Sequence, residues 1–287
     1  MRAHARFLSQ PKDFWANVRT ISQEIGYAVR RGAHKGQVKV PSPSQMRAAL
    51  QNMNLDFSHI VDATANLTPF GKLLSDYYEY RAGVLDDYVE PRLMHVDRAR
   101  QVFEELYKQL SPGCPIPMNK QKGEKKAPAY FTGIINMLVE RNAQGFPCDY
   151  DPHKLTTVTR DSKPLRTLAR RVDGAFPSTV NPIAVWQIKE YYYTTTFGSR
   201  VADGVYETLL DGMELEELWE HEDVDVKHYM RIDAHYTWWD CGRSYLCRIV
   251  DMLHMGYVDE VLFGYEVVER LPSIVKEWLS IAQNTAL

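Results

Sequence analysis

The chain has 287 residues, of which 45 % are hydrophobic and 25 % are charged, and its formal net charge is −3. This composition is typical of a globular protein with one large or two modest domains, whose core needs no disulfides. No apolar run approaches the roughly 18 residues needed to span a bilayer, and the N-terminus lacks the apolar region of a secretory signal. We therefore expect a soluble, cytoplasmic protein with no membrane partner.

Several common enzyme classes have no signature in this chain. The four cysteines, at positions 114, 148, 241 and 247, show neither CxxC pairing nor zinc-ligand spacing, so we expect free thiols. The nine histidines include no HExxH pair, and the chain has no G-x-S-x-G or P-loop motif. These observations argue against a zinc hydrolase, a serine hydrolase and an NTPase.

Charge is unevenly distributed along the chain. Residues 203–226 contain ten acids and no Lys or Arg, so the remainder of the chain carries +7. A mildly basic body with a separate acidic flank is compatible with DNA binding, and equally with a protein that is merely soluble.

Residues 1–110 are predicted to form a helical N-terminal region. Apolar residues recur at helical spacing over residues 12–30, and Gly26 is expected to end or bend that helix. Two further helices are predicted over residues 68–110, with a break at Pro91. The region is predicted to bind DNA or to mediate dimerisation.

A basic link joins the first helix to a second one, for which Ser42 or Ser44 is the expected N-cap. The candidate DNA-contacting residues of this link are Arg30, Arg31 and Lys35. A helix, a basic link and a helix fit a DNA-reading motif, but they also fit two helices packed on a core with a solvated loop.

Residues 111–127 are predicted to be a basic linker leading to a second domain at residues 128–287. Prolines and glycines prevent regular structure there. The cations that we expect to contact DNA are Lys120, Lys122, Lys125 and Lys126. Flexible ammonium groups can approach a phosphate backbone, although a solvated interdomain linker is the alternative.

The second domain is predicted to be α/β (α+β), with a mixed central sheet. The expected elements are a helix at 129–142, strands at 153–160, 165–176 and 183–193, a helix capped by Ser199, a strand at 227–239, a helix at 242–256, a strand at 257–268 and a closing helix around 271–282. The first two strands are expected to pair across a turn at residues 161–164.

Three polar residues belong to neighbouring predicted strands. Asp173 precedes a glycine near the end of one strand, and Gln187 and Lys189 lie on one face of the next, because side chains alternate along a strand. If the strands form a hairpin, an acid, an amide oxygen and an amine converge. Such a set can hold a divalent metal beside a phosphodiester. The alternative is an ordinary cross-strand ion pair between Asp173 and Lys189.

This arrangement resembles the PD-(D/E)XK nuclease superfamily, in which an Asp is followed one strand later by Glu-x-Lys. Gln187 stands where Glu is usual, and a Gln-x-Lys version is also found in Mrr-like restriction enzymes of that superfamily. The resemblance implies a restriction-endonuclease-like αβββαβ core. It also implies Mg²⁺ (or Mn²⁺) held by Asp173, Gln187 and the backbone carbonyl of Ile188, with Lys189 as the catalytic cation. An amide ligand should bind Mg²⁺ less strongly than a carboxylate.

Four further residues are candidates for the same site. The resembled superfamily often takes another acid from the helix before the first strand, which here offers Glu140. Arg200 and Asp203 follow the Gln-x-Lys strand, and Asp233 lies in an apolar strand. Each of the four also fits an ordinary surface or structural role.

The sequence therefore predicts a magnesium-dependent DNA endonuclease, in a restriction or other phage-defence system. We expect it to act as a homodimer or as a subunit of a defence complex. The alternative is a catalytically inactive subunit that uses the same fold to bind DNA or protein, and Gln187 is the residue that keeps this alternative open.

Overall fold

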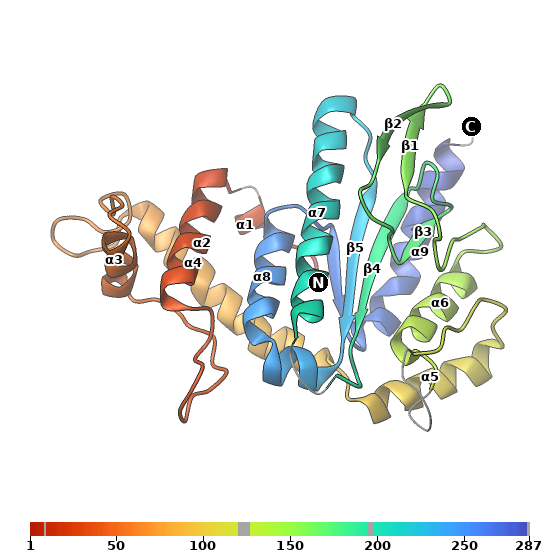
Figure 1. Ribbon diagram of the computed structural model, residues 1–287, viewed down its shortest axis with the longest axis horizontal. Helices are drawn as coiled ribbons and strands as arrows, with labels where there is room; N and C mark the ends of the chain where they lie inside the picture. Colours follow the sequence, from red (N-terminus) through yellow and green to blue (C-terminus); the bar gives the residue numbers. More distant parts are fainter. Residues whose placement is uncertain (9, 120–126, 195–197, 286–287) are drawn as a thin grey trace. The chain divides into compact units, whose positions relative to one another are not determined.

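The computed structural model describes residues 1–8, 10–119, 127–194 and 198–285 (Figure 1). The chain divides into two compact units, and each unit is built from segments that are distant in sequence. Unit 1 consists of Met1–Arg2, Arg92–His235 and Tyr257–Leu287, and unit 2 consists of Ala3–Pro91 and Tyr236–Gly256.

Unit 2 is helical, as the sequence predicted for the N-terminal region. Its helices are α1 (Ala5–Leu8), α2 (Lys12–Ile25), α3 (Pro43–Asn52), α4 (Pro69–Val84) and α8 (Arg243–His254), and short π-helical turns cover Leu85–Val89 and Tyr236–Cys241. The expected helix at 12–30 ends at Ile25 because Gly26 has a φ of 78°, which other residues rarely adopt. Ser42 is the N-cap of α3 and forms a capping box with Gln45.

A buried ion pair holds α8 in unit 2. The guanidinium Nη1 of Arg81 donates to both carboxylate oxygens of Asp251 at 3.0 Å, and the Tyr77 hydroxyl donates to the same carboxylate at 2.6 Å. The side chains of Arg81 and Asp251 are only 1 % and 4 % exposed. Since an unpaired buried charge is costly, the segment that carries Asp251 is needed to complete the core of this unit.

Unit 1 contains every strand of the fold that the structure describes. These strands are β1 (Thr157–Arg160), β2 (Lys163–Thr167), β3 (Gly174–Phe176), β4 (Ala184–Glu190), β5 (Lys227–Asp233) and β6 (Glu260–Phe263). The central sheet has the order β3-β4-β5-β6, with β3 antiparallel to β4 and the other two pairs parallel. The mixed α/β class and the helical N-terminal region predicted from the sequence are confirmed.

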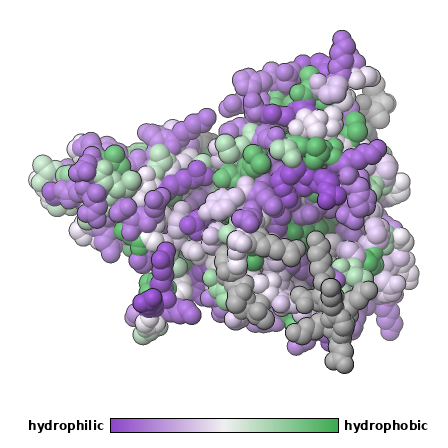
Figure 2. Space-filling view, viewed as in Figure 1, coloured by the Kyte–Doolittle hydropathy of each residue, from purple (hydrophilic) through white to green (hydrophobic). Residues whose placement is uncertain are grey.

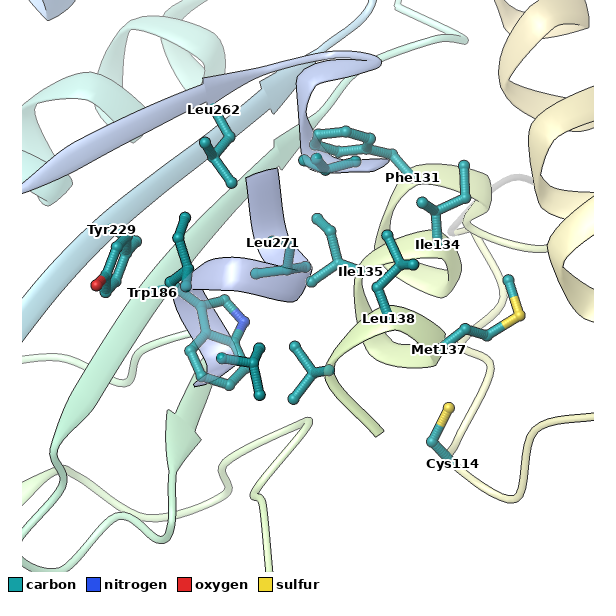
Figure 3. Close-up of a cluster of buried hydrophobic side chains, with 14 of the residues drawn as sticks. Cys114, Phe131, Ile134, Ile135, Met137, Leu138, Trp186, Tyr229, Leu262 and Leu271 are labelled. Atoms are coloured by element: carbon teal, nitrogen blue, oxygen red, sulfur yellow. The ribbon is translucent and has the colours of Figure 1, made fainter. Parts of the chain in front are cut away.

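Helices cover both faces of the central sheet. They are α6 (Tyr130–Asn142), α7 (Ser199–Glu222) and α9 (Glu266–Thr285), and α5 (Val96–Leu110) packs against α6. Figure 3 shows Phe131, Ile135 and Leu138 of α6 pointing toward Leu271 of α9 and Trp186 of β4. The side chains of neighbouring residues on β4 point to the opposite face, where α7 lies. The sheet is therefore the middle layer, and α7 covers the face on which the polar motif lies.

Several expected strands differ from the structure, and those expected at 153–160 and 183–193 are shortened to β1 and β4. Residues 165–176 do not form one strand but divide into β2 and β3, and β2 pairs with β1 in a separate two-stranded sheet. The turn expected at residues 161–164 is confined to Asp161 and Ser162, which both have positive φ, because Lys163 and Pro164 belong to β2. The strand expected at 227–239 ends at Asp233, and the one expected at 257–268 is confined to β6.

The units also differ from the expected division at residues 111–127. Helix α5 precedes that segment but belongs to unit 1, because it packs against α6. Residues 236–256 follow the segment but belong to unit 2. The four linker lysines, Lys120, Lys122, Lys125 and Lys126, lie outside the described residues.

No helix in the described part of the chain combines the length and the apolar character needed to cross a membrane. All four cysteines are free, as their spacing predicted. The cytoplasmic location stays a prediction.

Candidate active site

Asp173 lies where β3 begins, beside the middle of β4. Its backbone N–H donates to the carbonyl of Trp186 at 2.9 Å, and its carboxylate Oδ2 accepts from the N–H of Ile188 at 2.7 Å. Gly174 permits this close approach, because a Cβ at that position would lie 2.1 Å from the indole of Trp186. The Asp-Gly dipeptide thus fixes the acid against the strand that carries Gln187 and Lys189.

The side chains of Gln187 and Lys189 share one face of β4, as their period-2 spacing predicted. The ammonium Nζ of Lys189 donates to Oε1 of Gln187 at 3.3 Å, and both side chains are almost fully buried. Glu190 points to the other face, where its carboxylate accepts from the N–H of Thr132 at 3.0 Å in the first turn of α6. Burial raises the pKa of Glu190, although these α6 donors act in the opposite direction.

Helix α7 brings two further acids to this face. Glu207 Oε2 lies 3.3 Å from Lys189 Nζ, and one turn later Asp211 Oδ2 accepts from Nε2 of Gln187 at 2.8 Å. Arg170, in the segment between β2 and β3, bridges both acids, with 2.8 Å to Asp211 and 3.0 Å to Glu207. Gly204 leaves room for the lysine, since a Cβ there would lie 3.0 Å from Lys189 Cδ.

Asp211 is the most perturbed group of the cluster. Its side chain is 0 % exposed, and burial raises its pKa to about 7, while the charge of Arg170 and the hydrogen bond from it act in the opposite direction. Its second oxygen, Oδ1, has no hydrogen-bond partner. An ionised Asp211 carboxylate accepts hydrogen bonds and cannot donate one. It therefore turns Nε2 of the Gln187 amide toward α7, which places Oε1 toward Lys189.

Three oxygens of the cluster surround one cationic atom. Lys189 Nζ lies 3.3 Å from Gln187 Oε1, 3.3 Å from Glu207 Oε2 and 3.8 Å from Asp173 Oδ2. The side chains of Asp173 and Glu207 are 41 % and 42 % exposed, whereas that of Lys189 is 7 % exposed. The cluster therefore has a buried floor and a rim of two carboxylates that solvent can reach.

The donor set fits a hard divalent cation, since carboxylate and amide oxygens are ligands that Mg²⁺ accepts. Within the described residues, no group of at least three His, Cys, Asp or Glu side chains is arranged to hold a metal ion. The candidate ligand set has only two side chains of these types, the carboxylates of Asp173 and Glu207, and its third ligand is the amide oxygen of Gln187. The structure shows the N–H of Ile188 bonded to Asp173, and a ligand role for the Ile188 carbonyl stays a prediction.

Glu140 and Asp203 form no hydrogen bond or ion pair with the described residues of this cluster. Glu140 accepts a hydrogen bond from the N–H of Gly113 at 3.1 Å, at the far end of α6. Asp203 is exposed on α7, and the side chain of Arg200 lies outside the described part of the structure. The Glu140 carboxylate thus serves the loop that follows α5, and site roles for Arg200 and Asp203 stay predictions.

Asp233 is buried at the end of β5 and also lies outside the cluster. It accepts from the N–H groups of Met94 at 2.7 Å and Ala234 at 2.8 Å, and from the hydroxyl of Tyr192. Burial raises its pKa to about 7, and these donors act in the opposite direction. Asp233 is the register partner of Glu190. Its side chain therefore lies on the face of the sheet opposite to that of Lys189. Asp233 is thus a structural acid.

Sequence reasoning did not select Asp211 or Arg170, and it placed Glu207 only on the same helix face as Asp203. One signal for Asp211 was available: it occupies a position of α7 where helical spacing from Val205, Thr208, Leu215 and Leu218 requires a buried residue. An acid at such a position must have partners. Arg170 gave no comparable signal, because it lies outside regular structure.

Comparison with known proteins identifies two families along the chain. Residues 1–88 match the family described as Domain of unknown function (DUF7690), and residues 94–278 match the family described as Domain of unknown function (DUF7687). The gap between the matches coincides with the passage from unit 2 to unit 1 at residues 91 and 92. No curated protein and no solved structure matches the chain. Since the DUF7687 match covers more than half of the chain, this protein belongs to the DUF7687 family.

Proposed function

We propose that the protein is a metal-dependent DNA endonuclease whose active site is the cluster on β4 and α7. Asp173, Gln187 and Glu207 are the proposed ligands of Mg²⁺ (or Mn²⁺), and Lys189 is the proposed catalytic cation. When bound, such an ion would polarise a phosphodiester and lower the pKa of an attacking water. Glu207 thereby replaces the carboxylate that Gln187 lacks.

The observation that carries the proposal is the convergence of three oxygens, from three elements, on the single ammonium of Lys189. A surface ion pair would need only one acid. Here two acids and an amide surround a buried amine, and a further buried acid orients the amide. Burying these charged groups costs free energy of desolvation, and buried ion pairs seldom stabilise a fold on balance. A cation-dependent reaction therefore explains the cluster more readily than a role in stability does.

Each side chain has a defined task in this proposal. The Ile188 N–H holds Oδ2 of Asp173, the oxygen that lies 3.8 Å from Lys189 Nζ, and so fixes the carboxylate at the cluster. Asp211 turns the oxygen of Gln187 toward the cluster. The ammonium of Lys189 lies beside the ligands, where it can orient a water or offset negative charge that develops on the phosphate.

The choice of DNA as substrate, the restriction or phage-defence role and the homodimeric or multisubunit state rest on the sequence resemblance. The net charge supports none of them by itself. They are retained as proposals, together with the cytoplasmic location.

The decisive test is cleavage by the purified full-length protein. Supercoiled plasmid, linear duplex, single-stranded DNA and RNA should be incubated with Mg²⁺ or Mn²⁺, with a chelator control. Lys189→Met and Glu207→Gln should each reduce DNA cleavage by about 100-fold or more, because each removes a charge that acts in the transition state. Glu220→Gln is the matched control, since it removes the same charge from an exposed position of α7 and should leave the rate unchanged.

A second function has one observation in its favour. Lys189 and Arg170 already form ion pairs with both acids that α7 contributes to the cluster. A catalytically inactive DNA- or protein-binding subunit would show this arrangement permanently. Metal binding measured by calorimetry separates the two functions: a protein that neither cleaves any of the substrates nor binds Mg²⁺ or Mn²⁺ would refute the nuclease and leave the binding subunit.

A further inference from the structure

Unit 2 carries a hairpin arm, residues 27–39, between α2 and α3, whose two sides are joined by an isolated bridge and main-chain hydrogen bonds. Its base is closed by a hydrogen bond from the N–H of Lys39 to the carbonyl of Tyr27 at 2.9 Å and by a bridge between Ala28 and Val38. In Figure 1 the arm projects from the ends of α2 and α3, and the same projection in Figure 2 is mainly hydrophilic. The arm is thus an ordered hairpin with a solvated tip.

The tip of the arm concentrates unpaired positive charge. Residues 25–55 contain no Asp or Glu, and the exposed tip carries Arg30, Arg31 and Lys35. The side chains of these three residues form no ion pair with any residue that the structure describes. Repulsion among three uncompensated cations on a short hairpin is unfavourable, so the arm is suited to an anionic partner.

The other basic hairpin of the chain is different. In β1 and β2, Arg160 pairs with Glu222 at 2.8 Å and Arg166 pairs with Glu217, both acids coming from α7. The acidic stretch that the sequence shows at 203–226 therefore compensates the β1–β2 hairpin and the candidate active site.

Two arginines of α8 extend the basic surface at the arm. The guanidinium of Arg243 lies against the arm, because a Cβ on Gly36 would be 3.2 Å from its Cζ, and it stacks on Trp239 with Cζ 3.7 Å from the ring centroid. Arg248 stacks on Tyr27 with its Cζ 4.4 Å from the ring centroid. Both arginines donate hydrogen bonds to main-chain carbonyls, and neither forms an ion pair with an acid in the described part of unit 2.

We propose that the arm and its two neighbouring arginines bind the phosphate backbone of double-stranded nucleic acid. A two-stranded ribbon has the width that the major groove of a DNA duplex admits, and cations at its tip can reach phosphates on both sides. The selection of nucleic acid rests on the proposed function of unit 1, whereas the affinity of the arm for a polyanion does not. The arm would hold the substrate that the candidate active site cleaves.

The composition of the tip favours nucleic acid over a membrane surface. Residues 30–37 contain no Leu, Ile, Phe, Trp, Tyr or Met that could enter a bilayer. Stable attachment to a membrane usually needs an apolar anchor in addition to a few cations. The stacked arginines are also better suited to phosphate, because a guanidinium fixed on an aromatic ring presents its remaining N–H groups in a defined plane.

The test is the binding of a fluorescent 30-base-pair duplex to the full-length protein, followed by anisotropy in EDTA so that no cleavage occurs. The variant is Arg30→Ala/Arg31→Ala/Lys35→Ala. It should weaken binding by about tenfold or more near 0.1 M salt and reduce the log–log salt slope by about 2 to 3 units, because each lost phosphate contact removes about 0.9 unit. Arg160→Ala/Arg166→Ala is the control, since it removes paired cations of the same kind and should keep both values near wild type.

The result separates this inference from the nuclease proposal. Loss of binding in the arm variant, with no cleavage by the wild type under any condition, supports the arm and refutes the nuclease. Cleavage by the wild type with equal affinity and salt slope in the wild type and the arm variant overturns the arm. The arm proposal is also overturned if the arm variant binds the duplex like the wild type but no longer binds phosphatidylserine vesicles, a result that favours a membrane partner. Coincident thermal unfolding of the proteins excludes misfolding as the cause.

Discussion

Replacing Gln187 by Glu tests the geometry of the site through the stability of the fold. The change restores the carboxylate that the resembled superfamily has at this position. In the present structure, however, Nε2 of Gln187 donates to Asp211 at 2.8 Å, so a Glu would bring two carboxylates into contact. Two unit charges at that distance repel by about 6 kcal/mol at an effective dielectric constant of about 20, which is roughly four pKa units. The pair should therefore retain one proton well above neutral pH.

The sign of the resulting pH dependence follows from the raised pKa of Asp211. In the wild type this pKa is raised to about 7, so the folded state binds more protons than the unfolded state between about pH 4 and 7, and stability falls across that range. In Gln187→Glu the fall should continue to higher pH. Each pH unit over which the folded variant keeps the extra proton lowers its free energy of unfolding by about 1.4 kcal/mol. The variant should therefore be less stable than the wild type by about 3 kcal/mol at pH 9. The difference should shrink toward pH 6, where a protonated Asp211 can donate to the new carboxylate.

A second substitution should reverse the effect. In Gln187→Glu/Asp211→Asn the amide and the carboxylate exchange places, so the hydrogen bond returns with its direction reversed. Arg170 contacts the same Asp211 oxygen as Gln187, so in the double variant it loses that acceptor and keeps Glu207. Stability should return to within about 1 kcal/mol of wild type and lose its pH dependence above neutrality. The tighter Mg²⁺ binding that the sequence alone predicts for a Glu at 187 is now expected for this double variant.

The assay is urea unfolding at pH 6, 7.5 and 9, followed by circular dichroism. Gln101→Glu is the matched control, since the side chain of Gln101 donates to Glu105 at 2.9 Å on the exposed surface of α5. A like-charge pair there should cost only a few tenths of a kcal/mol. If Gln187→Glu lowered the free energy of unfolding as little as the control does, and equally at every pH, Gln187 and Asp211 would not be in contact. The proposed orientation of the Gln187 amide would then be refuted.

Three further outcomes are expected. Gly174→Ala should destabilise the protein by about 3 kcal/mol or more, because its Cβ would lie 2.1 Å from the indole of Trp186, and an unchanged melting temperature would contradict that packing. Asp251→Asn should cost about 3 to 5 kcal/mol by leaving Arg81 buried without a counter-ion, and urea unfolding measures this loss. Mg²⁺ affinity, measured by calorimetry, should rise from pH 6 to pH 8 as Asp211, whose pKa is about 7, ionises; an equal rise in Asp211→Asn would exclude that group as the cause.

The parts of the site that follow from local pattern were predictable. Strand alternation places Gln187 and Lys189 on one face whatever the rest of the fold does, and a glycine after Asp173 indicates a close approach of strands. Glu207 and Asp211 come from a helix, and the sequence does not say which strand a helix will cover. The part of the site supplied by α7 therefore depends on tertiary packing that no short window contains.

The division into units was not predictable for a related reason. The Pro- and Lys-rich composition of residues 111–127 marks irregular structure, but irregular structure occurs within units as well as between them. Helix α8 has an ordinary amphipathic pattern, and nothing in that pattern says that its apolar face completes unit 2. Only a long-range partner, such as Arg81 for Asp251, assigns it.

The interrupted composition of unit 2 has a consequence for synthesis of the chain. Arg81 is made 170 residues before Asp251, its buried counter-ion. At about 5 to 20 residues per second, this delay is roughly 10 to 30 s. Throughout it, α2 and α4 have left the ribosome with a charged side chain that cannot yet be buried at low cost. A nascent chain stalled before residue 243 should therefore have an Ala3–Pro91 segment that proteases digest, whereas the same segment in the completed protein should resist them.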